Sequence, residues 1–223
     1  MDIKIIHLLS YPKEEREINS ISSISKLDIP YTQHVNTVFT GKPPESKWPC
    51  ENSIRETSYG CYDSHKKALG EFNTDYLLVC ECDCIISIPP SQFLEILPFY
   101  IKDMEENNIA CLGIGSFCNT IKKETKELYI CEKMACTQCL LYSSEYKEMI
   151  NQDEDWQPYD SWLSRILGEK GKLAVVKQRT THQHIGRSLI DGLDKRMAKR
   201  VDSNGTEDIF TIWSDGMIYN ATF

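Results

Sequence analysis

The sequence predicts an α/β protein with a mostly parallel central sheet flanked by helices. Met1 to Leu9 contains an apolar, strand-prone run, and Glu14 to Leu27 follows it with apolar residues at helical spacing. A strand followed by a helix of these lengths begins an α/β unit. Farther along, Asp75 to Ile88 contains an unbroken run of strand formers, which is typical of a strand buried on both faces.

The remaining elements are expected from the same kinds of pattern. Glycine and proline cluster in residues 40–56, which predicts a long loop. Asp63 or Ser64 is expected to cap a short helix, and Pro98 is expected to kink or restart another helix. The apolar runs predict strands at Ile29–Phe39, Ile109–Ile114, Leu128–Cys131, Cys139–Tyr142 and Leu173–Lys177. Apolar residues at helical spacing predict helices from Phe93 to Met104 and from Asp160 onward. The charged segment Thr120–Glu127 is expected to be a connector.

The C-terminal tail carries less information. The run from Lys195 to Arg200 is basic, with acids nearby, and predicts an exposed, ion-paired helix. Ile209 to Trp213 is expected to form a strand or an assembly contact. Chain length suits one domain, so we predict a single domain over residues 1–190 and a C-terminal extension, residues 191–223, packed on it.

Composition excludes some classes of function. Lys and Arg number 25 against 33 Asp and Glu, and this net charge of −8 argues against binding nucleic acid or anionic membranes through bulk charge. No apolar run approaches the roughly 20 residues that span a bilayer, and the N-terminus lacks a basic segment followed by an apolar one. We therefore expect a cytoplasmic protein.

The ten cysteines invite a disulfide or zinc interpretation. Without a secretory signal, reduced thiols are the default. Cys136 and Cys139 form one C-x-x-C, but no second pair completes a tetrahedral zinc site nearby. We expect most of the cysteines to be small core residues.

Two acids interrupt the apolar pattern at the end of the predicted central strand. If the strand continues, Glu81 and Asp83 lie on one face, with Cys80, Cys82 and Cys84 on the other. Burying a carboxylate pair is costly unless it lines a cleft or holds a cation. The spacing suits Mg²⁺ or Mn²⁺ bridging a diphosphate. Solvated carboxylates at a strand end are the alternative.

Four segments in order resemble a known family. They are Gly60-Cys61-Tyr62-Asp63-Ser64-His65, the acids Glu81 and Asp83, Pro158-Tyr159-Asp160-Ser161-Trp162-Leu163, and Gln183-His184-Ile185-Gly186-Arg187-Ser188. The sequence resembles nucleotide-sugar glycosyltransferases of the GT-A (Rossmann-like) fold, and in particular the lipopolysaccharide glycosyltransferase family (family 25). Cys82 stands where that family has a further acid.

The resemblance implies a site for a nucleotide-sugar donor, with a uridine diphosphate sugar expected, and a Mn²⁺ or Mg²⁺ ion. It implies that Asp83 and His184 bind the metal and that Asp160 deprotonates a hydroxyl acceptor, giving transfer with inversion. Asp153, Glu154 and Asp155 are the runners-up for the base. The residues implied to contact the donor are Arg16, Tyr62, Ser64, His65 and Glu81.

Each residue also has a structural alternative, and the acceptor class stays open. Asp160 suits a helix cap, Arg16 an exposed helix arginine, and His184 a solvated loop. The acceptor is a glycan, a protein, a small molecule or a modified nucleobase. The alternative functions are a nucleotide-sugar-binding protein without turnover, and a metal-dependent phosphoesterase or nucleotidyltransferase.

Overall fold

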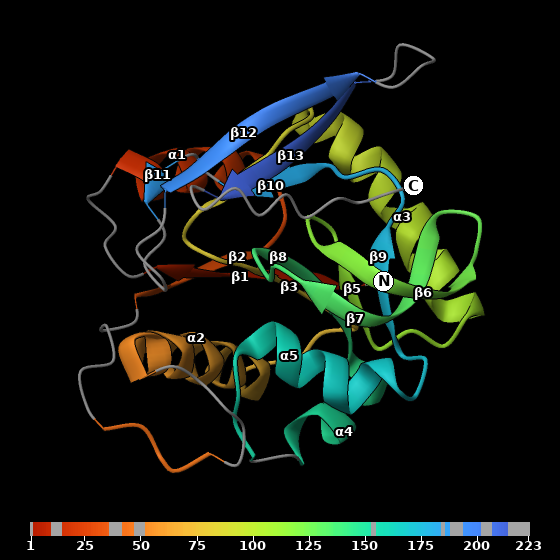
Figure 1. Ribbon diagram of the computed structural model, residues 1–223. Helices are drawn as coiled ribbons and strands as arrows, with labels where there is room; N and C mark the ends of the chain where they lie inside the picture. Colours follow the sequence, from red (N-terminus) through yellow and green to blue (C-terminus); the bar gives the residue numbers. More distant parts are fainter. Residues whose placement is uncertain are drawn as a thin grey trace.

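A computed structural model describes residues 2–9, 15–35, 42–46, 52–152, 155–183, 186–187, 194–201 and 207–213 (Figure 1). The helices are α1 (Glu15–Ile24), α2 (Asn52–Gly70), α3 (Pro90–Glu106), α4 (Lys147–Asn151) and α5 (Tyr159–Leu163), with short 3-10 turns η1 (Ser25–Leu27) and η2 (Ser144–Tyr146) and the π-helical turn η3 (Ser164–Gly168). The strands are β1 (Ile3–Leu9), β2 (Tyr31–Val35), β3 (Tyr76–Cys80), β4 (Cys84–Ile86), β5 (Cys111–Gly113), β6 (Phe117–Glu124), β7 (Leu128–Ala135), β8 (Cys139–Ser143), β9 (Leu173–Val176), β10 (Thr181–Gln183), β11 (Gly186–Arg187), β12 (Asp194–Val201) and β13 (Glu207–Trp213).

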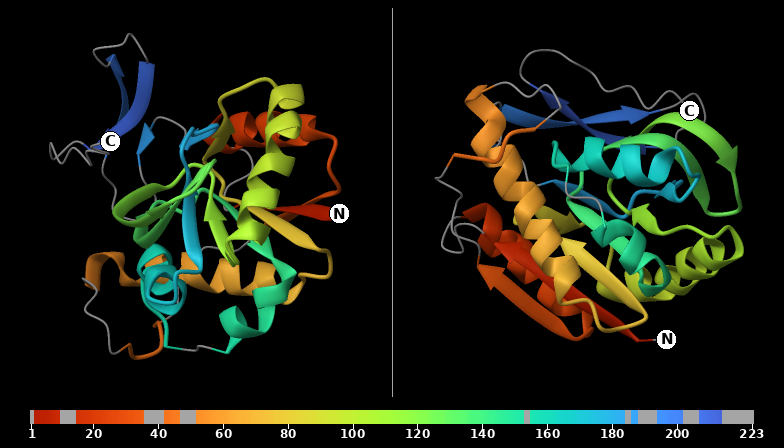
Figure 2. Two further views of the ribbon diagram at one scale, coloured as in Figure 1. Left: turned by 90° about the vertical axis from the view of Figure 1, so that its right-hand side faces the viewer. Right: turned by 90° about the horizontal axis from the view of Figure 1, so that it is seen from below.

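The predicted α/β class is confirmed. An eight-stranded sheet has the order β2-β1-β3-β8-β5-β9-β7-β6. β7 and β8 run against the other six strands, so the sheet is mostly parallel in strand direction. Helices α1 and α3 lie on one face, and α2, α4 and α5 lie on the other, as both sets of views show (Figures 1 and 2).

Alternation along β3 explains why the sheet holds two cores. Leu77 and Val79 pack with the buried residues of α2 and α5, whereas Leu78 and Cys80 pack with those of α1 and α3. All five residues of β3 are buried, which matches the expectation for a strand covered on both faces. The carboxyl ends of β1 and β3, which run parallel, therefore meet at one edge of the sheet.

Several expected boundaries are wrong. The segment Asp75–Ile88 is not one strand, because the chain turns after Cys80 and resumes as β4, which pairs with β10 in a separate sheet. The helix expected to start near Ser64 begins at Asn52. The connector at Thr120–Glu127 is largely β6, which pairs with β7. α3 continues through Pro98, so the expected restart there is wrong, while the kink that was the other expectation stays a prediction.

The C-terminal tail differs from expectation in one element. The basic run expected to form a helix is strand β12, which pairs with β11 and β13. The strand expected at Ile209–Trp213 is found within β13. The predicted boundary between residues 190 and 191 lies outside the described residues. Within the described ranges, no helix combines the length and apolar character needed to cross a bilayer.

Candidate functional site

The carboxyl end of β3 turns sharply where the two predicted acids lie. The backbone N–H of Cys84 donates to the carbonyl of Glu81 at 3.0 Å, and the N–H of Glu81 donates to the carbonyl of Gln138 at 2.9 Å. The Ser20 hydroxyl of α1 donates to the carbonyl of Cys84 at 2.6 Å. Because the segment is a turn, the expectation that Glu81 and Asp83 lie on one face of a continuing strand does not apply. Both acids lie in a turn that these hydrogen bonds hold in place.

Glu81 is the centre of a hydrogen-bond network. Its Oε1 accepts from His65 Nε2 at 2.9 Å, from Thr137 Oγ1 at 2.5 Å and from Cys61 Sγ at 3.6 Å. Because an ionised carboxylate only accepts, His65 is the Nε2–H tautomer in this contact. The Glu81 side chain is 17 % exposed. Oε1 thus accepts hydrogen bonds from three protein side chains, while part of the Glu81 side chain remains accessible to solvent.

The ring of His65 packs on a stack of two aromatic side chains of α5. It stacks on Tyr159 with centroids 4.0 Å apart, and Tyr159 stacks in turn on Trp162 at 5.3 Å. The Tyr159 hydroxyl lies 2.8 Å from that of Tyr142. The network therefore joins α2, β8 and α5 under the end of β3, and it leaves His65 fully buried.

Asp160 reaches the same region from the first turn of α5. Its Oδ1 accepts from the backbone N–H of Ser161 at 2.7 Å. Burial raises the pKa of Asp160, and the nearby charge of Glu81 raises it further, while the backbone N–H groups of Ser161 and Cys136 oppose the shift. The fold thus brings together three of the predicted site residues: His65, Glu81 and Asp160. A carboxyl group with a raised pKa close to a second acid is suited to take up a proton.

Asp83 lies half-buried in the turn, and strand pairing brings the fourth sequence segment to it. β10 runs antiparallel to β4, and Gln183 pairs with Cys84, the residue that follows Asp83. His184, predicted as a metal ligand, lies outside the described residues. In the described ranges, Asp83 belongs to neither of the two groups in which three metal-binding side chains lie within 4.8 Å of one another.

The other predicted site residues lie in different surroundings. Tyr62 is 6 % exposed and packs edge-on against Trp162 at 5.3 Å, so it is a core residue. The Ser64 hydroxyl donates to the carbonyl of Gly60 at 2.7 Å. Because α2 begins at Asn52, Ser64 and His65 lie in the helix interior and neither caps its start. Arg16 lies in α1, and its side chain is outside the described part of the chain, as are Asp153 and Glu154.

Sequence reasoning missed two members of this site. Cys61 lies four residues before His65 on α2, a spacing that places both on one helix face and was available from the sequence. Thr137 carries no local signal. It reaches Glu81 because β8 pairs with β3 and brings Cys139 opposite Cys80.

Comparisons with known proteins give distant structural likenesses. No protein-family model and no curated protein matches the sequence. The chain is similar to S. aureus TarS (residues 1–349), with 11% identity over 82% of this chain and 60% of that one and a TM-score of 0.47.

Two further structures are similar at the same level. A glycosyltransferase involved in glycosylation of the major capsid of PBCV-1 is 14% identical over 78% of this chain and 81% of that one, with a TM-score of 0.41. A CMP:2-keto-3-deoxy-manno-octonic acid synthetase complexed with CTP is 11% identical over 79% of this chain and 88% of that one, with a TM-score of 0.46. At these values, none of the three assigns an activity to this chain.

Proposed function

We propose that this protein is a metal-dependent glycosyltransferase of GT-A type that moves a sugar from a nucleotide donor, a UDP-sugar, to a hydroxyl acceptor. One observation carries the proposal: the pairing of Gln183 with Cys84 joins the segment before His184 to the turn that holds Asp83. These segments are about a hundred residues apart in the sequence, and the family resemblance assigns them to one site.

The oxygen atoms that the turn offers as metal ligands suit a hard divalent cation. Asp83 offers carboxylate oxygens, one of which is buried. Oxygen ligands are those that Mg²⁺ and Mn²⁺ prefer, and the histidine that the resemblance adds favours Mn²⁺. We assign metal binding to Asp83 and His184. When bound, such an ion neutralises the charge of a departing diphosphate.

Asp160 is the proposed general base. Its raised pKa, caused first by burial, strengthens it as a proton acceptor. The carboxylate takes the proton of the acceptor hydroxyl as that oxygen bonds to the anomeric carbon and the bond from that carbon to the diphosphate breaks. This is a single displacement, and it inverts the anomeric centre.

Glu81 and His65 have a positioning role in this proposal. The His65 contact and the Thr137 contact orient the Glu81 carboxylate at the rim of the sheet. The exposed edge of Glu81 would then be available to bind the donor or metal, directly or through water. Tyr62 packs on Trp162, and the Ser64 hydroxyl donates to the carbonyl of Gly60 in the same helix. We therefore assign both residues a packing role beside the site.

A donor screen tests the function. The protein is incubated with a panel of UDP-sugars and Mn²⁺, and released UDP is measured. We expect release with one donor, loss of release on adding a chelator, and loss in Asp83→Ala. Binding without release favours a nucleotide-sugar-binding protein without turnover. Release of pyrophosphate or phosphate favours the nucleotidyltransferase or phosphoesterase alternative.

A further inference from the structure

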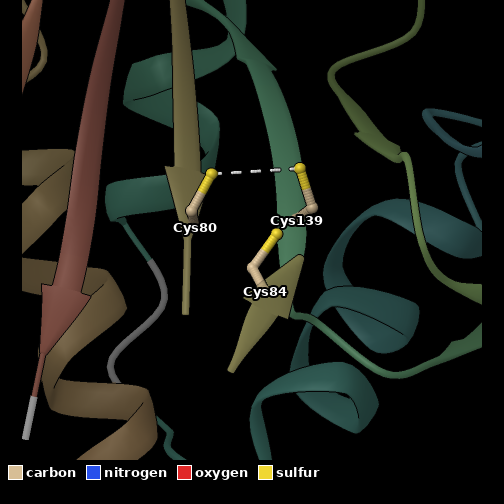
Figure 3. A group of neighbouring side chains, drawn as sticks. All are labelled: Cys80, Cys84 and Cys139. Carbon is tan, nitrogen blue, oxygen red and sulfur yellow. Dashed lines mark hydrogen bonds between the residues drawn. The ribbon is translucent and has the colours of Figure 1, made fainter. Parts of the chain in front are cut away.

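Three fully buried cysteines converge on one point beside the candidate site. Cys80 ends β3, Cys84 begins β4 and Cys139 begins β8, and their sulfur atoms face one another (Figure 3). Each side chain is 0 % exposed, and the three sulfurs lie within 4.8 Å of one another. The Sγ atoms of Cys80 and Cys139 are 4.0 Å apart.

We propose that Cys80, Cys84 and Cys139 bind one thiophilic divalent cation of the Zn²⁺ class through their three sulfur atoms. This site is separate from the metal site proposed for sugar transfer, which uses Asp83 and His184. It also differs from the C-x-x-C considered in the sequence, because Cys136 takes no part in it.

The separation of the Cys80 and Cys139 sulfurs matches that of two ligands of one metal ion. Three sulfurs that each lie about 2.3 Å from a Zn²⁺ ion stand about 3.8 Å apart in a tetrahedral arrangement and about 4.0 Å apart in a trigonal one. The observed Cys80 to Cys139 separation is 4.0 Å. A disulfide would bring two sulfurs to about 2.0 Å and leave the third thiol alone.

A fourth donor lies next to the cluster. The Thr181 hydroxyl of β10 lies beside Cys139. Thr181 is 2 % exposed, and within the described ranges its Oγ1 has no hydrogen-bond partner of good geometry. In this proposal, the Thr181 hydroxyl is the expected fourth ligand of the ion.

Charge and burial favour a divalent ion in this environment. A lone thiolate in a dry core is costly, and a dication bound to three thiolates leaves one net negative charge in place of three. Each ligating thiol loses its proton to solvent as its S–H bond is replaced by a bond to the metal, so binding releases up to three protons. In the part of the chain that the structure describes, β4 has three residues and pairs with β10, so local opening of this short strand would give the ion a path to the buried sulfurs.

The consequence is a metal that holds the acidic turn in place. Cys80 and Cys84 flank the segment from Glu81 to Asp83, so one ion bound to both cysteines would fix the two ends of this turn. Its bond to Cys139 would link the turn to β8. The role is structural, and we expect binding to raise the melting temperature of the whole chain.

Cadmium binding tests the site. The full chain, reduced with a phosphine, is refolded with one equivalent of Cd²⁺ and desalted, and retained metal and ultraviolet sulfur-to-cadmium absorption are measured. We expect one retained ion. In Cys84→Ala and Cys139→Ala the affinity should fall at least tenfold. Cys111→Ala is the matched control, since Cys111 is fully buried and outside the cluster, and it should retain the ion.

Two results would overturn the proposal: no Cd²⁺ retained by the reduced wild-type chain, or retention unchanged in both cluster variants. The second result would locate the ion elsewhere, such as at Cys61, His65 and Glu81. X-ray absorption of the wild-type complex counts sulfur neighbours directly and needs no variant to fold. Three sulfurs support the assignment, and two or fewer contradict it.

Discussion

His65 Nε2 lies 2.9 Å from Oε1 of Glu81, which ties the interior of α2 to the carboxyl end of β3. The imidazole is fully buried and also stacks on Tyr159. The contact orients the Glu81 carboxylate, and the imidazole fills the core next to that carboxylate. A buried hydrogen bond to a charged group is among the stronger side-chain interactions in a protein.

Replacing His65 should therefore destabilise the fold. We expect His65→Ala to lower the free energy of unfolding by about 2 to 4 kcal/mol, because it leaves a cavity and an unsatisfied carboxylate oxygen. His34 provides a control, since it also lies 3.0 Å from a glutamate, Glu71, at the surface. His34→Ala should cost less than about 1 kcal/mol. Urea unfolding of both variants measures the difference, and equal losses would contradict a central role for His65.

Asp83→Ala should abolish Mn²⁺-dependent donor binding, because it removes the proposed carboxylate ligand. Isothermal titration calorimetry with the donor found in the screen measures this. Asp63→Ala is the control, because Asp63 pairs with Lys67 on the surface of α2 and has no role in the proposed site. An unchanged donor affinity in Asp83→Ala would remove Asp83 from the metal site.

Asp160→Asn should leave donor binding intact and reduce transfer at least about a hundredfold, since the amide cannot accept the acceptor's proton. Asp155→Asn, an exposed neighbour, should transfer normally. Because the pKa of Asp160 is raised, the wild-type rate should fall on acidification at a pH above the ordinary range for aspartate. The same shift favours the protonated folded state, so Asp160→Asn should be at least as stable as wild type at neutral pH. Full turnover in Asp160→Asn would show that the base lies elsewhere.

His7 should make stability depend on pH. Burial lowers its pKa from 6.5 to about 4, although a backbone hydrogen bond to Glu81 opposes the shift. The folded state then excludes a proton that the unfolded state binds. The contribution of His7 is fully present above about pH 6.5 and is lost as pH falls to about 4, a change of about 3 kcal/mol.

Denaturant unfolding at a series of pH values measures this dependence. The His7 ring lies 2.8 Å from the Tyr31 hydroxyl and 2.9 Å from that of Ser20, so His7→Gln keeps polar atoms nearby while removing the titration. The difference between wild type and His7→Gln should shrink as the pH falls. A constant difference from neutral pH to about pH 4 would contradict the assignment.

Gly168 allows η3 to lie directly on β7. A Cβ at this position would overlap the carbonyl oxygen of Glu132, so Gly168→Ala must displace backbone and should cost about 2 kcal/mol or more. At Gly70, a Cβ would meet nothing within 4 Å, and Gly70→Ala should be neutral or slightly stabilising. Thermal or urea unfolding separates the two, and a tolerated Gly168→Ala would show that η3 shifts freely.

Local pattern determined the elements whose signal lies within a few residues. The apolar run from Tyr76 to Val79 predicted a strand buried on both faces, and β3 is one. Helical spacing likewise predicted α1 and α3. These predictions succeed because burial of alternate or every third to fourth side chain leaves a period that a short stretch of chain records.

Tertiary structure decided what surrounds the acids. Glu81 gains His65 and Thr137 as partners, and Cys80 and Cys84 meet Cys139, only after α2 packs on the sheet and β8 pairs with β3. The turn after Cys80 and the strand at Lys195 to Arg200 likewise depend on pairing with distant segments. Hydrogen bonds between strands join residues far apart in the chain, so no local period records them, and which side chains share a site is settled only when the strands pair.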